Sequence, residues 1–143
     1  MWTPNLKVIR LIRMNQSFMN RRLADLKLSS GLYYFVLELE PAERMTMSEL
    51  SAAVGVDNGH CSRAIERLVA LGYVSRLRDR ADRRSMKVAL TESGRAAALA
   101  VTEAVREWVG VIQKDIPKDE IALTNSVIDR YYGNAIAEGL AER

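Results

Sequence analysis

The sequence predicts a mainly α-helical fold with one small β-hairpin, and three patterns indicate it. Long segments at both ends of the chain carry apolar residues at helical spacing. Between them lie two short segments that each begin with a helix-capping residue and end near a glycine. Two further segments alternate apolar and polar residues, as the strands of a hairpin do. A chain of 143 residues suits a single domain with its own core.

The first helix is expected over residues 5–27, where basic side chains fall largely between the apolar positions. These apolar positions are Leu6, Ile9, Ile12, Phe18, Leu23 and Leu26. Ser29 or Ser30 can cap a second helix, from Gly31 to about Glu40, which must end before Pro41. The expected core stripe of this second helix consists of Leu32, Phe35, Val36 and Leu39.

Two capped helices then follow in tandem. Thr46 and Glu49 have the spacing of a capping box, which opens a helix to about residue 54. Gly55 stands where a left-handed residue would end that helix, and Asp57 can cap a second helix over 58–71. Two helices joined by a short turn with a glycine form the helix-turn-helix pattern, which also occurs in proteins that bind no nucleic acid.

The β-hairpin is expected from two alternating segments, 73–78 and 86–90, joined by a polar and charged tip. Such a hairpin beside a helix-turn-helix is called a wing. Thr91 can cap a long helix from Glu92 to about Lys114. Pro117 suits the start of a last helix, over residues 118–139.

The positive charge of the chain is concentrated on the expected wing. The net charge is only +3, yet residues 76–87 contain six basic and two acidic side chains. A solvated loop is one interpretation of this segment, and contact with a polyanion is the other. Arginines beside a helix that could enter a groove favour the polyanion.

Several classes of protein lack support in the sequence. No apolar run is long enough to span a membrane, and the N-terminus lacks the apolar core of a secretory signal. A single cysteine fits a reducing cytoplasm. No catalytic constellation or phosphate-binding glycine loop is visible, and His60 has no partner at metal-binding spacing. We therefore expect no enzyme activity, catalytic residue, cofactor or metal, and a cytoplasmic protein.

Residues 45–94 contain the motifs SRAIERL at 62–68, LGYV at 71–74, DRR at 82–84 and LTESG at 90–94. Through these motifs the segment resembles the MarR family of winged-helix transcriptional regulators. The resemblance implies a winged helix-turn-helix protomer of four helices, a hairpin and two further helices, which dimerises through its first and last two helices. The expected organisation is one domain over 1–143, with a DNA-binding lobe at 32–90 and dimerisation helices at 1–28 and 92–143.

A homodimer is also expected from the apolar surface. The helix over 92–114 would be roughly 34 Å long, longer than a small winged-helix core requires. Apolar residues near the chain ends need a partner, because large apolar patches are rarely left open. They are Leu6, Ile9, Ile121, Val127, Ile128 and Ile136. A two-fold dimer would select an inverted repeat in double-stranded DNA, with half-sites about 34–36 Å apart.

The helix over 58–71 corresponds to the recognition helix of the family. Side chains of its first turns would reach base edges in the major groove, since Asn can pair with adenine and Arg with guanine. The candidates are Asn58, Gly59, His60, Ser62 and Arg63. Asn58 and Ser62 could instead satisfy local backbone groups. Arg67 could contact a phosphate or remain solvated.

The wing would lie on the minor groove. Arg83 or Arg84 is the candidate for insertion, and Asp82 could orient the inserted guanidinium. The other basic side chains would contact phosphates, which position a protein but do not read sequence. These are Arg76, Arg78, Arg80 and Lys87.

The expected function is that of a repressor whose DNA binding responds to a small ligand. Family members commonly bind small aromatic or anionic ligands between the dimer helices and the winged lobe. Such a cleft could be lined by Phe18, Arg22, Tyr33, Tyr34 and Trp108, which could equally be plain core.

Two alternatives also remain at this point. Redox-sensing members carry a cysteine near the N-terminus, but here Cys61 lies in the recognition helix. It is either a small, partly buried helix residue or a thiol whose oxidation disturbs DNA binding. The alternative to DNA binding as a whole is a winged helix used for protein contacts.

Overall fold

The computed structural model describes residues 4–29, 31–78, 81–82 and 85–140. The elements, in chain order, are α1 (Pro4–Arg22), α2 (Leu32–Leu39), β1 (Met45–Thr46), α3 (Met47–Val54), α4 (Asn58–Ala70), β2 (Val74–Arg78), β3 (Met86–Leu90), α5 (Glu92–Ile112) and α6 (Lys118–Ala137). The predicted mainly α-helical fold with a β-hairpin wing is therefore confirmed.

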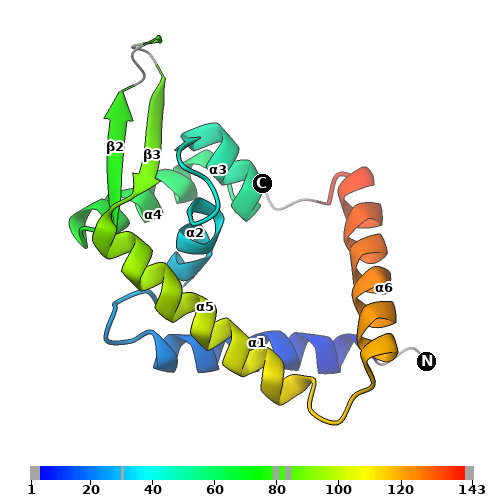
Figure 1. Ribbon diagram of the computed structural model, residues 1–143. Helices are drawn as coiled ribbons and strands as arrows, with labels where there is room; N and C mark the ends of the chain where they lie inside the picture. The colour runs from blue at the N-terminus through cyan, green and yellow to red at the C-terminus, as the bar shows by residue number, and fades with distance from the viewer. Residues whose placement is uncertain (1–3, 30, 79–80, 83–84, 141–143) are drawn as a thin grey trace.

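The elements form a lobe and an extended helical frame (Figure 1). Helices α2, α3 and α4 gather at one end with the β2–β3 hairpin, which projects away from them. Helix α5 leads out of this lobe and packs against α1 and α2, while α6 rises on the far side of the molecule. The arrangement leaves the hairpin and α4 on an open face of the lobe.

The first helix ends earlier than its apolar spacing predicted, at Arg22 rather than residue 27. Leu23 still donates its backbone N–H to Met19 O at 2.9 Å, but the chain then turns and Lys27 adopts a φ of 58°. Leu23 and Leu28 are buried in this turn. The apolar pattern continued past the helix because Leu23 and Leu26 contribute to the core from irregular backbone.

The predicted serine cap of α2 is wrong. Gly31 is the N-cap, with a φ of 82° and no side-chain cap bond, and the helix starts at Leu32 rather than at Gly31. Ser29 contributes only its carbonyl, which accepts from the Leu32 N–H, and Ser30 lies outside the described residues. The left-handed backbone at residue 31 explains the glycine, because other residues adopt it at a cost.

The sheet contains a third strand that the sequence did not indicate. β1 pairs with β3 in antiparallel register, Met45 opposite Val88 and Thr46 opposite Lys87, giving the order β1-β3-β2. Two residues are too few to show alternation, so no sequence pattern could predict this strand. β3 contacts α2, α3 and α5 in addition to the two neighbouring strands, and its consecutive residues Val88, Ala89 and Leu90 are all buried.

The core is centred on α2. The predicted stripe of this helix is buried, and it is joined by side chains from α1, α3, α4, β3 and α5. In contrast, no residue of Lys118–Ala137, all described, is buried in the protomer. Large apolar side chains are exposed on α6 and on α1, including Leu6, Ile9, Ile12, Ile128, Tyr131 and Tyr132. None of the helices that the structure describes is long and apolar enough to span a membrane.

Candidate nucleic-acid interface

The start of α3 is the predicted capping box. The Glu49 N–H donates to Thr46 Oγ1 at 3.1 Å, and the Thr46 N–H donates to the Glu49 carboxylate at 2.8 Å. Hydrogen bonding of the Thr46 backbone N–H and the Thr46 side chain to the Glu49 carboxylate, with a smaller contribution from nearby Lys87, lowers the pKa of Glu49. The reciprocal bonds between Thr46 and Glu49 thereby define the N-terminus of α3.

Asp57 caps α4, as predicted. Its Oδ1 accepts the His60 N–H at 2.7 Å, and Gly55 before it has the left-handed φ of 79° expected for a helix stop. The His60 N–H is the main cause of the lowered pKa of Asp57, with further contributions from the Gly59 N–H and from Arg63. Asp57 therefore carries a stable negative charge at the positive end of the α4 dipole.

Asn58 contacts the preceding helix. The Ser51 hydroxyl donates to Asn58 Oδ1 at 3.0 Å, and Ser51 itself is buried. This contact joins α3 to α4 across the turn. Asn58 therefore takes part in the α3–α4 contact from the exposed first turn of α4.

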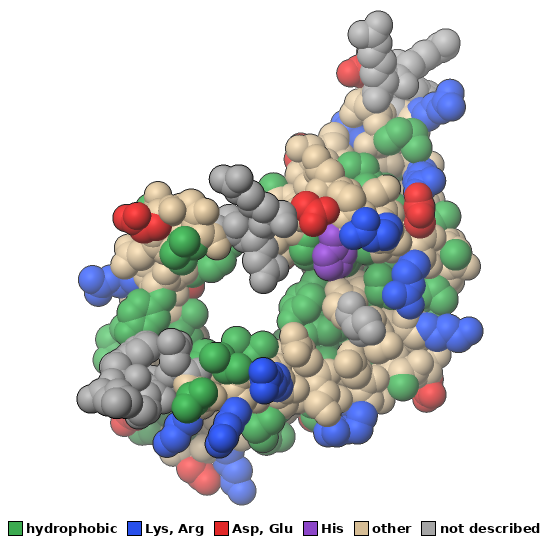
Figure 2. Space-filling model, turned by 180° about the vertical axis from the view of Figure 1, so that it is seen from behind, with side chains coloured by type: hydrophobic (Ala, Val, Ile, Leu, Met, Phe, Trp, Pro, Cys, Tyr) green, Lys and Arg blue, Asp and Glu red, His purple; other side chains and the backbone are tan. Residues whose placement is uncertain are grey.

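The first turns of α4 present a compact basic surface. A β-carbon on Gly59 would lie 3.1 Å from Asp57 Oδ1 and 3.3 Å from a guanidinium nitrogen of Arg63, so the glycine lets Arg63 approach the cap. The chain places His60, Arg63 and Arg67 around a shallow hollow of about 260 Å³ with Leu32 and Ala64. In Figure 2 basic side chains lie beside the histidine and continue toward the wing. Ser62 is half-buried at the edge of this surface.

The opposite side of α4 belongs to the core. Ile65 and Leu68 are buried. Cys61 is fully buried as well, its thiol 3.8 Å from the carbonyl oxygen of Met47 as a weak donor, and burial raises the pKa of the thiol. A buried thiol with a raised pKa is a poor nucleophile, which favours the interpretation of Cys61 as a packing residue.

The two strands of the wing distribute their basic residues over both faces. Arg76 lies opposite Val88 and Arg78 opposite Met86, and directly opposed residues project from the same face of a sheet. Lys87 projects from the other face, between Leu77 and Thr46, and is half-buried close to Glu49. The predicted phosphate contacts therefore do not form one continuous row.

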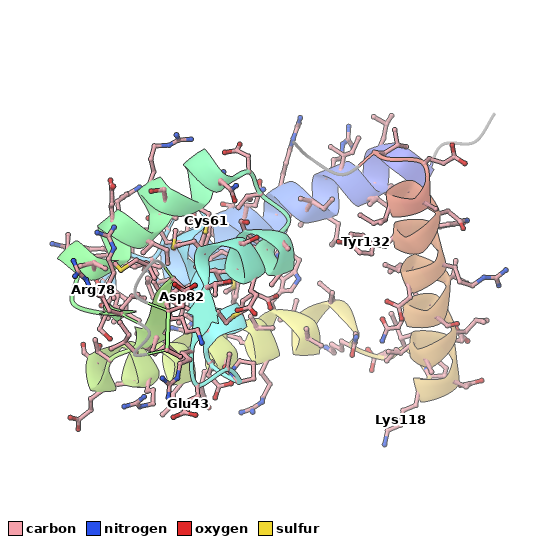
Figure 3. The ribbon with its side chains drawn as sticks, turned by 90° about the horizontal axis from the view of Figure 1, so that it is seen from above. Glu43, Cys61, Arg78, Asp82, Lys118 and Tyr132 are labelled. Atoms are coloured by element: carbon pink, nitrogen blue, oxygen red, sulfur yellow. The ribbon has the colours of Figure 1, made fainter. Side chains whose placement is uncertain are left out.

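The tip of the wing is described only in part. Asp82 is exposed, whereas Arg80, Arg83 and Arg84 lie outside the described residues. Figure 3 shows Arg78 and Asp82 at the lobe, far from Lys118 and Tyr132 on α6. The described basic side chains of α4 and β2 thus lie at one end of the protomer.

A junction that the sequence reasoning missed connects α4, the wing and α5. The Thr91 hydroxyl donates to Gly72 O at 2.6 Å, and the Thr91 N–H donates to Tyr73 O at 3.0 Å. The Gly94 N–H donates to Thr91 Oγ1 at 2.9 Å, so Thr91 caps α5 as predicted while also holding the end of α4. The LTESG motif was the available signal for this junction.

The five side chains of the predicted ligand cleft fall into two groups. Where α1 passes α5, the rings of Phe18 and Trp108 lie 5.6 Å apart, and Arg22 forms an ion pair of 2.7 Å with Glu107. Tyr33 and Tyr34 instead line a pocket of about 300 Å³ with Gly31 and two amides of α1, Gln16 and Asn20. Gln16 and Asn20 were not predicted, although they are one helical turn apart.

No cluster of three His, Cys, Asp or Glu that could hold a metal ion occurs within the described part of the chain. The geometry that remains is a capped helix with exposed basic side chains, held by Thr91 beside a projecting basic hairpin. Such an arrangement suits a polyanionic groove.

Comparison with known proteins shows the same arrangement elsewhere. A model of the MarR family matches residues 33–85. The multiple antibiotic resistance protein MarR of Escherichia coli is 31% identical over 122 residues, which cover 79% of this chain and 82% of that protein. The regulator BilQ of Clostridioides difficile is 24% identical over 98 residues, and the matched part spans 66% of its length.

Two solved structures share the fold over nearly the whole chain. A crystal structure of the transcriptional regulator SlyA has a TM-score of 0.90 at 18% identity, covering 96% of each chain. A mutant MarR of E. coli in complex with operator DNA has a TM-score of 0.79 at 23% identity, covering 89% of this chain and 91% of that one. With the E. coli relative above, these matches show that the chain belongs to the MarR family of winged-helix transcriptional regulators.

Proposed function

We propose that the chain is a transcriptional regulator that binds an inverted-repeat operator in double-stranded DNA as a homodimer. The observation that carries the proposal is the exposed basic surface of α4, fixed by Thr91 beside a projecting basic hairpin. The E. coli MarR mutant with the same fold was solved with operator DNA. The first turns of α4 enter the major groove in this proposal, and the wing lies on the adjacent minor groove.

The side chains of α4 divide into base contacts and phosphate contacts. Arg63 is the strongest candidate for a guanine, because it is exposed and the tight approach at Gly59 holds its guanidinium near Asp57. Asn58, His60 and Ser62 complete the base-reading group, and Arg67 contacts a phosphate. On the wing, Arg76, Arg78 and Lys87 contact phosphates with Arg80, while Arg83 or Arg84 inserts into the minor groove beside Asp82.

The dimer follows from surface that the protomer leaves uncovered. Helix α6 buries no residue of its own, and a cleft of about 440 Å³ separates its Tyr132, Ala135 and Ile136 from the α3–α4 turn. Figure 2 shows hydrophobic side chains around this opening. We assign residues 1–28 and 92–143 to dimerisation and residues 32–90 to DNA binding, and a second copy covers the apolar side of α6.

The finer parts of the proposal are a repressor role, a response to a small ligand and the absence of enzyme activity. Repression requires that the bound dimer occludes the promoter. A ligand can change DNA affinity only by its preference for one spacing of the two α4 helices. A DNA partner also agrees with the cytoplasmic location expected from the sequence.

The test is a binding titration with a duplex that the purified protein selects from a random pool. We expect Arg63→Ala with Arg67→Ala to raise Kd at least about tenfold, since one good base contact contributes roughly 1–3 kcal/mol. Arg106→Ala is the control for the loss of an exposed arginine away from α4, because Arg106 is exposed on α5 and pairs with Glu103. An unchanged Kd in the double variant would place the DNA contacts on residues other than Arg63 and Arg67. Failure to select any duplex, or no fall of affinity with added salt, would instead favour a winged helix used for protein contacts.

A further inference from the structure

We propose that Lys27, in the turn 23–28 that follows α1, contacts a DNA phosphate on the side of α4 opposite to the wing. Lys27 lies outside the segment 32–90 assigned to DNA binding, so this contact widens the interface with the duplex. The inference rests on the proposed function and adds a positioning residue to it.

The backbone of Lys27 has a conformation that favours glycine. Its φ is 58°, and the turn is closed by hydrogen bonds from the Lys27 N–H to Ala24 O at 3.0 Å and from the Leu28 N–H to Leu23 O at 3.3 Å. Glycine adopts this left-handed conformation after a helix without steric cost, whereas the β-carbon of a lysine is strained there. Asp115 is the other non-glycine residue of the described chain with a positive φ, and aspartate tolerates this conformation better than lysine. A strained lysine at this point indicates a role for its side chain.

The turn is fixed against the winged lobe. The hydroxyl of Tyr73, between α4 and β2, donates to Leu26 O at 3.1 Å. Leu28 is buried and Leu26 packs against the core, while Lys27 between them is exposed. Because the backbone on both sides of Lys27 is already held, less conformational freedom is lost when its ammonium group binds a phosphate.

The basic surface of α4 extends toward this turn. Leu32, at the start of α2, lines the shallow hollow together with Arg63 and Arg67. In Figure 2 basic side chains lie beside the histidine and continue to the outer edge of the lobe. In Figure 1 α4 lies between the projecting hairpin and the turn that joins α1 to α2. A helix in the major groove has a phosphate strand on either side, so the turn faces the strand that the wing does not reach.

The charge of the first helix and its turn suits a polyanion. Residues 4–29 contain six basic side chains and one acidic side chain, a second concentration of positive charge besides the wing. At the end of α1, Arg22 is paired with Glu107 at 2.7 Å, and Arg21 donates to Ser17 Oγ at 3.0 Å. Lys27 forms no ion pair with any other residue that the structure describes. Its ammonium group can therefore bind a phosphate without first breaking a contact within the protomer.

The experiment compares Lys27→Gly with the wild type in anisotropy titrations of the full-length protein against the selected duplex, at several potassium chloride concentrations. We expect the slope of log affinity against log salt to fall by about one, and Kd at about 0.15 M salt to rise roughly fivefold, the effect of one lost phosphate contact. A duplex of unrelated sequence should show the same loss, because a phosphate contact does not read sequence. Since glycine suits a φ of 58°, the thermal midpoint should stay the same or rise by a few degrees.

Two control variants separate the charge of Lys27 from its backbone. Asp115→Gly relieves the same left-handed strain in the connection between α5 and α6, and it should keep the wild-type slope. Lys27→Arg keeps a cation at the turn and should also keep the wild-type slope. The two controls together assign the expected loss to the positive charge at residue 27.

A wild-type slope in Lys27→Gly, or an equal fall of the slope in Asp115→Gly, overturns the inference and leaves the proposed function in place. If Arg63→Ala with Arg67→Ala weakens binding while Lys27→Gly does not, the DNA contacts are confined to the segment 32–90. If the wild type binds no duplex at all, the proposed function is rejected and the inference is rejected with it.

Discussion

Gly94 lies so close to the backbone carbonyl of Tyr73 that a β-carbon at residue 94 would overlap the oxygen. The contact joins the first turn of α5 to the segment between α4 and the wing. Thr91 reinforces it through bonds to Gly72 and Tyr73. The orientation of the basic helix relative to the basic hairpin therefore depends on a residue that has no side chain.

Replacing this glycine should damage the lobe. In Gly94→Ala the new methyl group can be accommodated only by moving backbone, and overpacking of this kind costs roughly 1–3 kcal/mol of unfolding free energy. Urea denaturation measures the loss. Gly110→Ala is the control in the same helix, because a β-carbon there meets nothing within 4 Å. It should leave the protein as stable or up to about 1 kcal/mol more stable. Equal stability of both variants contradicts the contact.

Gly59→Ala should separate DNA binding from stability. The added methyl would stand 3.1 Å from Asp57 Oδ1 and 3.3 Å from Arg63, and the arginine is the flexible neighbour that gives way. Alanine stabilises a helix by up to about 1 kcal/mol relative to glycine. The unfolding free energy of the variant should therefore not fall below that of the wild type by more than about 0.3 kcal/mol. The affinity for the selected duplex should fall, as measured by fluorescence anisotropy. If this variant binds the duplex with wild-type affinity, the contribution of Arg63 to DNA binding does not depend on its position beside Asp57.

The capping carboxylate of α4 should make stability depend on acid pH. The folded-state pKa of Asp57 is lowered, so the unfolded chain takes up this proton first as the pH falls. The stabilisation by Asp57 is therefore complete above the ordinary aspartate pKa and disappears as the pH drops through the lower folded value. Asp57→Asn keeps a capping oxygen but no titrating group. The gap in thermal midpoint between the wild type and this variant should narrow from pH 7 toward pH 3. If the difference in thermal midpoint between the two proteins stays constant with pH, groups other than Asp57 cause the pH dependence of stability.

The caps of the helix-turn-helix could be predicted because they are local. Thr46, Asp57 and Thr91 each bond to a backbone N–H three residues ahead, and that distance along the chain is visible in the sequence. The buried stripes of α2 and α4 could be predicted for a related reason, since one helical period places them on one face.

The features that the sequence did not indicate depend on tertiary contacts. Leu23 and Leu26 extended the apparent helix because the core, not the helical period, requires their side chains. The split of the expected ligand cleft depends on how α1 crosses α5, which sets Phe18 against Trp108 and leaves Tyr33 elsewhere. No spacing within one segment contains this information.

The two faces of the wing should respond differently to alanine substitution. Arg78 is exposed, and Arg78→Ala should lower the slope of log affinity against log salt by about one, the effect of one lost phosphate contact. Lys87 is half-buried near Glu49, so Lys87→Ala should reduce the slope less and lower the midpoint of urea unfolding more. Anisotropy titrations at several potassium chloride concentrations measure the slopes. Equal slopes for both variants would show that burial beside Glu49 does not weaken the proposed phosphate contact of Lys87.

The apolar side of α6 should control assembly. Ile128 is 55% exposed in the protomer, and Tyr132, one helical turn later, is exposed beside it. A charge there costs nothing in an isolated protomer but is buried without a partner in the proposed dimer, so Ile128→Asp should dissociate the dimer. Sedimentation equilibrium should show the monomer mass, with helical content unchanged by circular dichroism. The control is Ser126→Asp, since Ser126 is exposed and lies on the opposite side of α6, given 3.6 residues per turn. This variant adds the same charge and should remain dimeric. A dimeric Ile128→Asp would place the interface on other residues, and the assignment of α6 to dimerisation would then be wrong.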